Sequence, residues 1–86
     1  MTTDDFIRRA KKAVRDSYNA KAKRNGGGQI GTANVWLVWL CKTLQNQKAL
    51  LITDTFDGKY YEFTYNGDKR EGYLDTYVKE TNEVVL

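Results

Sequence analysis

Residue types that commonly do chemistry in enzymes are scarce in this sequence. The 86 residues include no histidine and a single cysteine, Cys41. Without histidine there is no Ser-His or Cys-His pair and no imidazole ligand for a metal. Cys41 closes the apolar run that begins at Val35, so we expect a small buried side chain of a central strand rather than a nucleophile. These features predict a non-catalytic protein with no cofactor and no metal site.

Two local patterns are superficially similar to catalytic sites. The glycine-rich stretch 26–32 suggests a phosphate-binding loop, but no strand precedes it, no helix follows it, and the Gly-Lys-Ser/Thr ending is missing. Asp54, Asp57 and Glu62 could hold Mg²⁺ for phosphodiester hydrolysis. Acidic residues are frequent around turns, and Asp57 suits a turn, so solvated turn carboxylates are the favoured interpretation.

The charges of the chain are unevenly distributed, although its formal net charge is only +3. Residues 1–24 contain eight Lys/Arg and three Asp, whereas residues 53–86 contain four Lys/Arg and eight Asp/Glu. A basic first quarter and an acidic last third can steer partners of opposite charge to different faces. They can equally attract each other, within one chain or between copies.

The basic candidate surface lies on a predicted N-terminal helix. Arg8, Lys12 and Arg15 follow one side of that helix, and Asn19 continues the row. Such a row can contact nucleic-acid phosphates with a salt-dependent affinity. The alternative is a charged outer face that only keeps the helix soluble, and it is favoured because no nucleic-acid-binding motif accompanies the row.

The acidic candidate surface is rich in tyrosine. Tyr and Trp supply large, rigid contact area and dominate the energetics of protein interfaces. The residues that we assign to partner binding are Tyr60, Glu62, Asp68, Glu71, Tyr73, Asp75 and Tyr77. A neighbouring aromatic row of Tyr61, Phe63 and Tyr65 could stack nucleobases, but packing in the core explains it better.

An amphipathic helix over residues 3–20 positions the basic surface. Thr2 and Asp5 match a capping box, and the apolar residues from Phe6 to Tyr18 fall on one side at helical spacing. Any continuation toward residue 25 would be solvated, because Lys21 and Arg24 enter the apolar side. Glycines make residues 25–32 a flexible connector.

Strands are predicted to fill residues 34–80. Asn34–Thr43 is apolar at both alternating sets of positions, which is typical of a central strand covered on both faces. Further strands are predicted over residues 48–55 and 59–65, with hairpin signals at Asp57-Gly58 and Asn66-Gly67. The segment 72–86 is favoured as a returning strand, with a helix as the alternative.

The predicted fold class is α+β, with the N-terminal amphipathic helix packed on an antiparallel β-meander of three to four strands in one domain, residues 1–86. One helix can cover only one face of a sheet, yet the first two strands look apolar on both. Either the C-terminal segment covers the second face, or another chain does, as a homodimer or as a target protein. An uncovered sheet face with Trp and Leu would exceed the usual exposed apolar patch of a monomer.

Composition places the chain among soluble proteins of the cytoplasm. Apolar residues make up 41% and aromatic residues 13%, which is ordinary for a folded domain. A lone cysteine allows no intramolecular disulfide, which fits a reducing cytosol. The N-terminus lacks the pattern of a signal peptide, and the longest apolar run, Val35–Cys41, is too short to span a membrane.

Several short segments between Val35 and Thr81 carry a family resemblance. They are Val38-Trp39, Cys41 to Asn46, Lys48 to Leu51, Asp57-Gly58, Tyr60 to Lys69, Asp75, Tyr77 and Lys79. In these segments the chain resembles a small family of uncharacterised proteins encoded by phages and prophages of Gram-positive bacteria. The N-terminal helix matches more loosely, and Gly26–Gly28 and Gly72 depart from the pattern. The resemblance implies a phage genome and the cytoplasm of a host cell, and it implies no catalytic residues.

Small phage proteins of this kind often bind a host or defence protein and inhibit it. We therefore expect a non-catalytic protein of a phage or mobile element that modulates or inhibits such a complex, for example as an anti-CRISPR-type inhibitor. The acidic C-terminal third could engage a basic groove of the target as a charge mimic. The alternative is a nucleic-acid-binding accessory phage protein that uses the basic helix face.

Overall fold

The helix α1 (Thr3–Arg24) opens the chain in the computed structural model, which describes all 86 residues. Thr2 caps its N-terminus, because the Thr2 hydroxyl accepts a hydrogen bond from the Asp5 amide at 3.1 Å, as the sequence predicted. The helix runs one turn beyond the predicted end at residue 20, and its last residues are exposed. The additional turn therefore lengthens α1, but its exposed side chains add little to the core.

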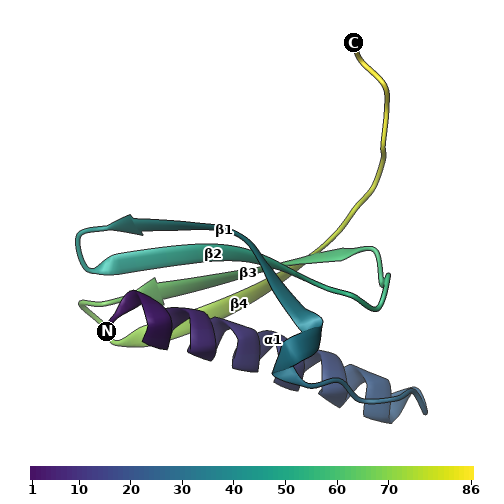
Figure 1. Ribbon diagram of the computed structural model, residues 1–86, viewed down its shortest axis with the longest axis horizontal. Helices are drawn as coiled ribbons and strands as arrows, with labels where there is room; N and C mark the ends of the chain where they lie inside the picture. The colour runs from purple at the N-terminus through teal and green to yellow at the C-terminus, as the bar shows by residue number, and fades with distance from the viewer.

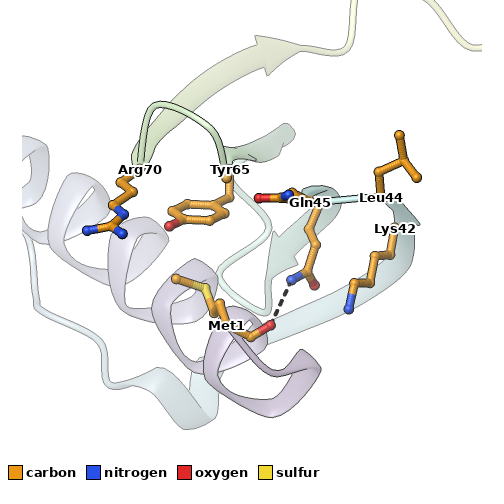
Figure 2. A pocket seen from close by; sticks show the side chains of 8 residues that line it. Met1, Lys42, Leu44, Gln45, Tyr65 and Arg70 are labelled. Atoms are coloured by element: carbon orange, nitrogen blue, oxygen red, sulfur yellow. Dashed lines mark hydrogen bonds between the residues drawn. The ribbon is translucent and has the colours of Figure 1, made fainter.

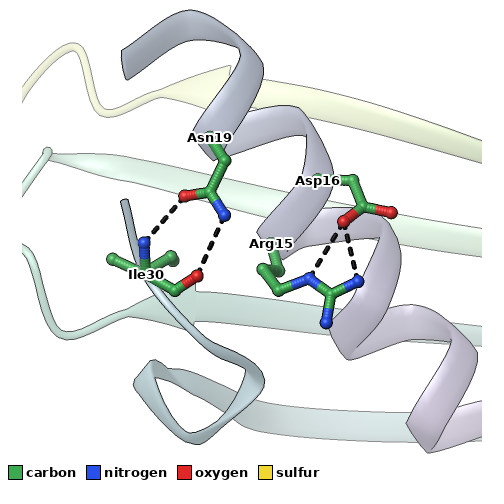
Figure 3. A network of polar contacts seen from close by, with 4 residues as sticks. All are labelled: Arg15, Asp16, Asn19 and Ile30. Carbon is green, nitrogen blue, oxygen red and sulfur yellow. Dashed lines mark hydrogen bonds and ion pairs between the residues drawn. The ribbon is translucent and has the colours of Figure 1, made fainter. Parts of the chain in front are cut away.

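A glycine-rich connector leads from α1 back to the sheet. Gly26 adopts a positive φ of 74°, and the Gly27 amide bonds to the Ala22 carbonyl at 2.7 Å, which is the Schellman ending of a helix. Farther along, the backbone N–H and C=O of Ile30 both bond to the Asn19 side chain, at 2.8 and 2.9 Å (Figure 3). Asn19 is half-buried and fastens the connector to α1. The amide group that was predicted to continue the basic row is therefore engaged by the Ile30 backbone.

Four antiparallel strands follow a short 3₁₀ turn at Thr32–Asn34, and α1 packs on one side of them (Figure 1). They are β1 (Val35–Thr43), β2 (Asn46–Thr53), β3 (Lys59–Asn66) and β4 (Glu71–Val78), and they lie side by side in chain order. This arrangement confirms the α+β class and the meander. It also confirms a returning strand at the start of the segment 72–86, because β4 spans Glu71–Val78, whereas residues 79–86 form neither strand nor helix.

The core lies between α1 and one face of the sheet. It comprises Phe6, Ala10, Val14, Val35, Ala49, Leu51, Tyr61 and Phe63, each at most 9% exposed. The Phe6 and Phe63 rings lie 5.5 Å apart between centroids, a distance typical of interacting aromatic pairs. The apolar side of the helix thus meets every second residue of β2 and β3, as the period-2 alternation of a strand requires.

β1 is an edge strand, so the prediction that it lies at the centre of the sheet is wrong. Only β2 pairs with it, and Trp36, Val38 and Trp39 are exposed. Cys41 is also exposed, which corrects its expected burial. The two-sided apolar pattern has a different cause, a β-bulge that shifts the register between Leu37 and Trp39.

The β2–β3 loop is longer than the predicted two-residue turn and spans residues 54–58. Gly58 has a φ of 71°, and Phe56, 97% exposed, has a φ of 57°. The Asp57 carboxylate accepts hydrogen bonds from the Lys59 amide at 3.1 Å and from the Tyr61 hydroxyl at 2.8 Å. Asp57 therefore anchors the loop to the buried end of β3.

Burial, reinforced by the hydrogen bond to Asp57, raises the pKa of the Tyr61 phenol well above its usual range. The unfolded chain releases this proton near about pH 10, whereas the folded protein retains it. The resulting stability is fully present below that pH and is lost as the pH rises toward the folded pKa. We expect the unfolding free energy of the wild type to fall, relative to Tyr61→Phe, by up to about 1.4 kcal/mol per pH unit above about pH 10. Urea unfolding at several alkaline pH values measures this difference, and parallel curves for the two proteins would contradict it.

The β3–β4 loop, residues 67–70, replaces the predicted Asn-Gly turn. Asn66 organises it, because its side-chain oxygen accepts bonds from the Asp68 and Lys69 amides at 3.1 and 3.2 Å. The positive φ falls on Arg70, at 56°, rather than on Gly67. Gly67 is needed for a different reason, since a Cβ there would lie 2.3 Å from the Gln45 carbonyl oxygen of the neighbouring turn.

Gly67→Ala is therefore expected to destabilise the fold by about 1–3 kcal/mol, because a backbone atom must move to admit the methyl group. Gly28→Ala is the matched control, since a Cβ at Gly28 meets nothing within 4 Å. Urea denaturation of the two variants provides the comparison. Equal midpoints would show that the close approach of the two turns does not constrain the fold.

The C-terminal segment does not cover the second face of the sheet. After β4 the chain forms no further strand or helix and runs away from the sheet (Figure 1). Val84, Val85 and Leu86 are at least 81% exposed. The C-terminal segment, the first of the two predicted ways to cover that face, is therefore excluded.

No helix in the structure combines the length and the apolar character needed to cross a membrane.

Candidate functional site

The face of the sheet that points away from α1 carries most of the candidate residues, and we call it the open face. No element of the chain packs on it, because α1 is the only helix long enough to cover a sheet and lies on the other side (Figure 1). Its central residues are Trp36, Trp39, Cys41, Lys48, Leu50, Ile52, Tyr60, Glu62, Thr64, Tyr73, Asp75 and Tyr77. They alternate along each strand with the buried core residues.

The β1 bulge brings both tryptophans to the open face. Residues three apart in a regular strand point to opposite faces. The register shift between Leu37 and Trp39 reverses that alternation, so Trp36 pairs with Ile52 and Trp39 pairs with Leu50, all on the open face. Val35, Leu37 and Leu40 then pack toward α1. The bulge thus gives β1 one apolar set for the core and another for the surface.

Apolar and aromatic side chains gather toward the end of the open face where β1 begins. Trp36 pairs with Ile52 across β1–β2, and Tyr60 pairs with Tyr77 across β3–β4. We call the resulting cluster the apolar corner, and it consists of Trp36, Trp39, Leu50, Ile52, Tyr60 and Tyr77. Trp36 is 58%, Trp39 40% and Tyr77 51% exposed. Large aromatic side chains in such numbers are typical of a protein-binding surface.

Carboxylates border the apolar corner on β3 and β4. Glu62 and Asp75 are direct cross-strand neighbours, and we call them the acidic pair. Lys48 lies 3.4 Å from the Glu62 carboxylate, between Nζ and Oε1, whereas Asp75 makes no ion pair. Farther along β4, the Tyr73 hydroxyl donates to the Glu71 carboxylate, and this hydrogen bond raises the pKa of Tyr73. This half of the open face is therefore both acidic and rich in tyrosine.

The structure brings six of the seven residues assigned to partner binding onto the open face. Asp68 is the exception, because it lies in the β3–β4 loop. The sequence reasoning did not include Trp36, Trp39, Leu50 and Ile52 among the candidate site residues. Their signal was present as apolar character on both sides of the first two strands, but it was interpreted as two-sided burial.

Two cations of the predicted basic row are paired with acidic residues of the same helix. The guanidinium of Arg8 pairs with Asp5 at 2.7 Å and lowers the Asp5 pKa, and Arg15 pairs with Asp16 at 2.9 Å. Figure 3 shows Arg15 turned toward Asp16 beside the Asn19 bonds. Of the four predicted residues, only Lys12 is free of such contacts.

A different set of cations surrounds the first turns of α1. Arg9 and Lys12 of the helix and Arg70 of the β3–β4 loop line one groove of about 390 Å³, together with Asp16. Arg70 and Lys42 also line an adjoining pocket of about 340 Å³ (Figure 2). In that pocket the Gln47 side chain donates to the Met1 carbonyl at 3.4 Å. The basic surface thus depends on Arg70, which the helix pattern alone did not indicate.

The residues considered for chemistry do not converge on one site. The Asp54 carboxylate accepts a hydrogen bond from Asn34, Asp57 holds Tyr61, and Glu62 pairs with Lys48. No three His, Cys, Asp or Glu side chains are grouped as a metal ion would require. The aromatic row considered for base stacking faces α1, where Tyr61 and Phe63 are buried.

Comparison with known proteins identifies one family. The model of a family of unknown function, DUF6275, matches residues 7–86. The chain belongs to this family. The DUF6275 match covers nearly all of α1 and the whole sheet, so the open face is part of the family's domain. No curated protein and no solved structure matches the chain.

Proposed function

We propose that this DUF6275 protein is a non-catalytic binding module that holds another protein on its open face. The observation that carries the proposal is the apolar corner, where Trp36, Trp39 and Tyr77 are each at least 40% exposed on a sheet face that no other element covers. Exposing such a cluster is unfavourable in water, and aromatic clusters of this kind are the usual anchors of protein interfaces. A four-stranded sheet also holds the side chains in place before binding, which reduces the entropy lost on association.

The charges of the open face favour a partner with a basic surface. Glu62, Glu71 and Asp75 lie on this face, and Lys48 is its only cation within the strands. A basic groove that normally binds nucleic acid presents complementary charge. We therefore infer that this chain is a phage or mobile-element protein, and that it inhibits a nucleic-acid-binding protein by occupying its basic groove. The resemblance to phage-encoded proteins supports that setting, and an anti-CRISPR-type inhibitor is one example.

Site-specific cross-linking tests the proposal. A photo-reactive amino acid replaces Tyr77 on the open face or, as the matched control, Lys12 on the helix side, and each protein is expressed in a bacterial host. We expect one defined protein adduct from the Tyr77 position and none of the same mass from the Lys12 position. The adduct should also require Trp36, because the two residues share the apolar corner.

Two outcomes would overturn the proposal. An adduct that forms equally from the Lys12 position places the partner elsewhere. An adduct that consists of two copies of this chain shows that the open face serves self-association instead of target binding. If the adduct forms from the Tyr77 position alone and contains a different protein, reconstituting the complex from purified proteins confirms that protein as the target.

The groove lined by Arg9, Lys12 and Arg70 favours nucleic-acid binding as a second candidate function. Cations from a helix and a loop that line one groove can follow a phosphate backbone, and the affinity should then fall with salt. A gel shift that is lost in the triple Glu variant of these residues, but kept in Lys23→Glu at the far end of α1, would support it. A shift that is insensitive to the triple change would exclude this groove.

A further inference from the structure

The acidic pair is an unfavourable arrangement for the isolated sheet. Glu62 and Asp75 lie directly opposite each other across β3–β4, and like charges at such positions repel. Lys48 compensates only Glu62, at 3.4 Å, and Asp75 has no cation partner in the structure. A sheet selected for stability alone would place a neutral or basic residue at one of these positions. A cation beside Asp75 would offset this repulsion.

Tyrosine rings border the acidic pair on the same face. Tyr73 and Tyr77 are the two residues of β4 on either side of Asp75 on the open face, and Tyr60 pairs with Tyr77. Tyr73 is 45% and Tyr77 51% exposed, so their ring faces are accessible. Aromatic faces attract cations through the quadrupole of the ring. Carboxylates and rings that lie together form a position suited to a basic side chain.

A cation of the chain already approaches this surface. The Lys79 ammonium lies 6.0 Å from the centroid of the Tyr60 ring, within the range of a cation–π interaction. Lys79 belongs to the C-terminal segment, which leaves the sheet directly afterwards. It contacts one ring and no carboxylate, so the acidic pair itself stays available.

We propose that the acidic pair binds an arginine side chain of the partner protein, with its guanidinium plane against the tyrosine rings. The inference rests on the proposed function and names the chemistry of the partner at the same site. Arginine fits better than lysine because its planar fork bonds two carboxylate oxygens at once, it stacks on aromatic rings, and it sheds water more readily. The apolar corner beside it would then hold the neighbouring apolar residue of the partner.

Titration with short peptides tests the inference without the partner. The isotope-labelled protein is titrated with an acetylated, amidated Leu-Arg-Leu peptide and with the same peptide carrying citrulline, a neutral isostere of arginine. We expect saturable NMR shifts for Glu62, Asp75 and Tyr77 with the arginine peptide only. In the Glu62→Gln, Asp75→Asn double variant the apparent affinity should fall by up to about fivefold for each ion pair lost, since an exposed ion pair contributes no more than about 1 kcal/mol. Glu83→Gln, which neutralises an exposed carboxylate of the C-terminal segment away from the sheet, should bind as the wild type does.

The stability of the double variant is the control for folding, because we expect stability to stay equal or rise while the affinity for the peptide falls. The double variant loses the repulsion together with the Lys48–Glu62 ion pair, which is partly exposed and contributes little. It should therefore unfold at a urea concentration equal to or higher than that of the wild type. Equal binding of the citrulline peptide, or wild-type binding by the double variant, would overturn the arginine assignment. Concentration-dependent shifts of the same residues without peptide would assign the position to a second copy and overturn it as well. If the Tyr77 cross-link nevertheless forms, the proposed function stands and only the arginine assignment fails.

Discussion

Replacing Trp36 and Trp39 together with serine is expected to weaken the binding of the protein partner by at least about 100-fold. Aromatic anchors at the centre of an interface contribute about 2 kcal/mol or more each, and each such loss corresponds to roughly a 30-fold change in affinity. Isothermal titration calorimetry with the partner identified by cross-linking measures the effect. The variant should remain folded, because the two side chains are 58% and 40% exposed and contribute little to the core.

The control for this prediction is Leu44→Ser. Leu44 is 89% exposed in the β1–β2 turn, at the opposite end of β1 from Trp36. It removes exposed apolar surface without changing the apolar corner, so binding should stay within about twofold of the wild type. A Trp variant that binds as tightly as Leu44→Ser would mean that the partner does not use the open face.

Phe6→Ala is expected to reduce the unfolding free energy by about 3–5 kcal/mol. The Phe6 side chain is fully buried, and its ring lies 5.5 Å from that of Phe63, so its removal leaves a cavity where α1 meets the sheet. A domain of this length has a total stability of roughly 4–13 kcal/mol, so the variant loses a large part of it. Urea unfolding followed by circular dichroism measures the change.

Phe56→Ala supplies the matched control, because it makes the same substitution at a site that is 97% exposed. Its unfolding free energy should change by no more than about 0.5 kcal/mol. The contrast between two phenylalanines tests whether the chain has one core, beneath α1. A comparable loss of unfolding free energy in Phe56→Ala would contradict a single core beneath α1, because it would mean that Phe56 is also packed.

The sequence was sufficient to predict the layers of this fold. The helical spacing from Phe6 to Tyr18 and the Thr2 cap specified α1, and the apolar runs and hairpin signals specified the strands and their antiparallel pairing. These features are local, because each follows from the spacing of neighbouring residues. They did not determine the exact turns. In the β3–β4 loop, the close approach of Gly67 to Gln45 depends on contacts between two hairpins.

The place of β1 in the sheet could not be predicted, and the β-bulge is the reason. A run that is apolar at every position fits a central strand with two covered faces. It fits equally an edge strand whose bulge turns Val35, Leu37 and Leu40 inward and Trp36 and Trp39 outward. The bulge has no glycine or other local signal in this strand. The bulge can be recognised only from the register of β1 with β2. With that register, the strand that was predicted to be buried contributes Trp36 and Trp39 to the candidate binding site.

Some features of the candidate site could likewise be predicted from the sequence, whereas others depend on the sheet register. The acidic and tyrosine positions of β3 and β4 were predicted because charge in a strand indicates exposure. Their pairing across the ladder, which sets Glu62 against Asp75, emerges only from the register. On the helix, the helical spacing placed Asn19 in the basic row, but it did not reveal that the Asn19 side chain holds the connector at Ile30.

The most direct test of the open face is tryptophan fluorescence, since the only two tryptophans of the chain are Trp36 and Trp39. The emission of the free monomer should be shifted toward that of the unfolded chain and readily quenched by acrylamide. Addition of the partner should shift the emission to the blue and protect both indoles from the quencher. Protected, blue-shifted tryptophans in the free monomer, or no change on complex formation, would contradict a binding surface on this face.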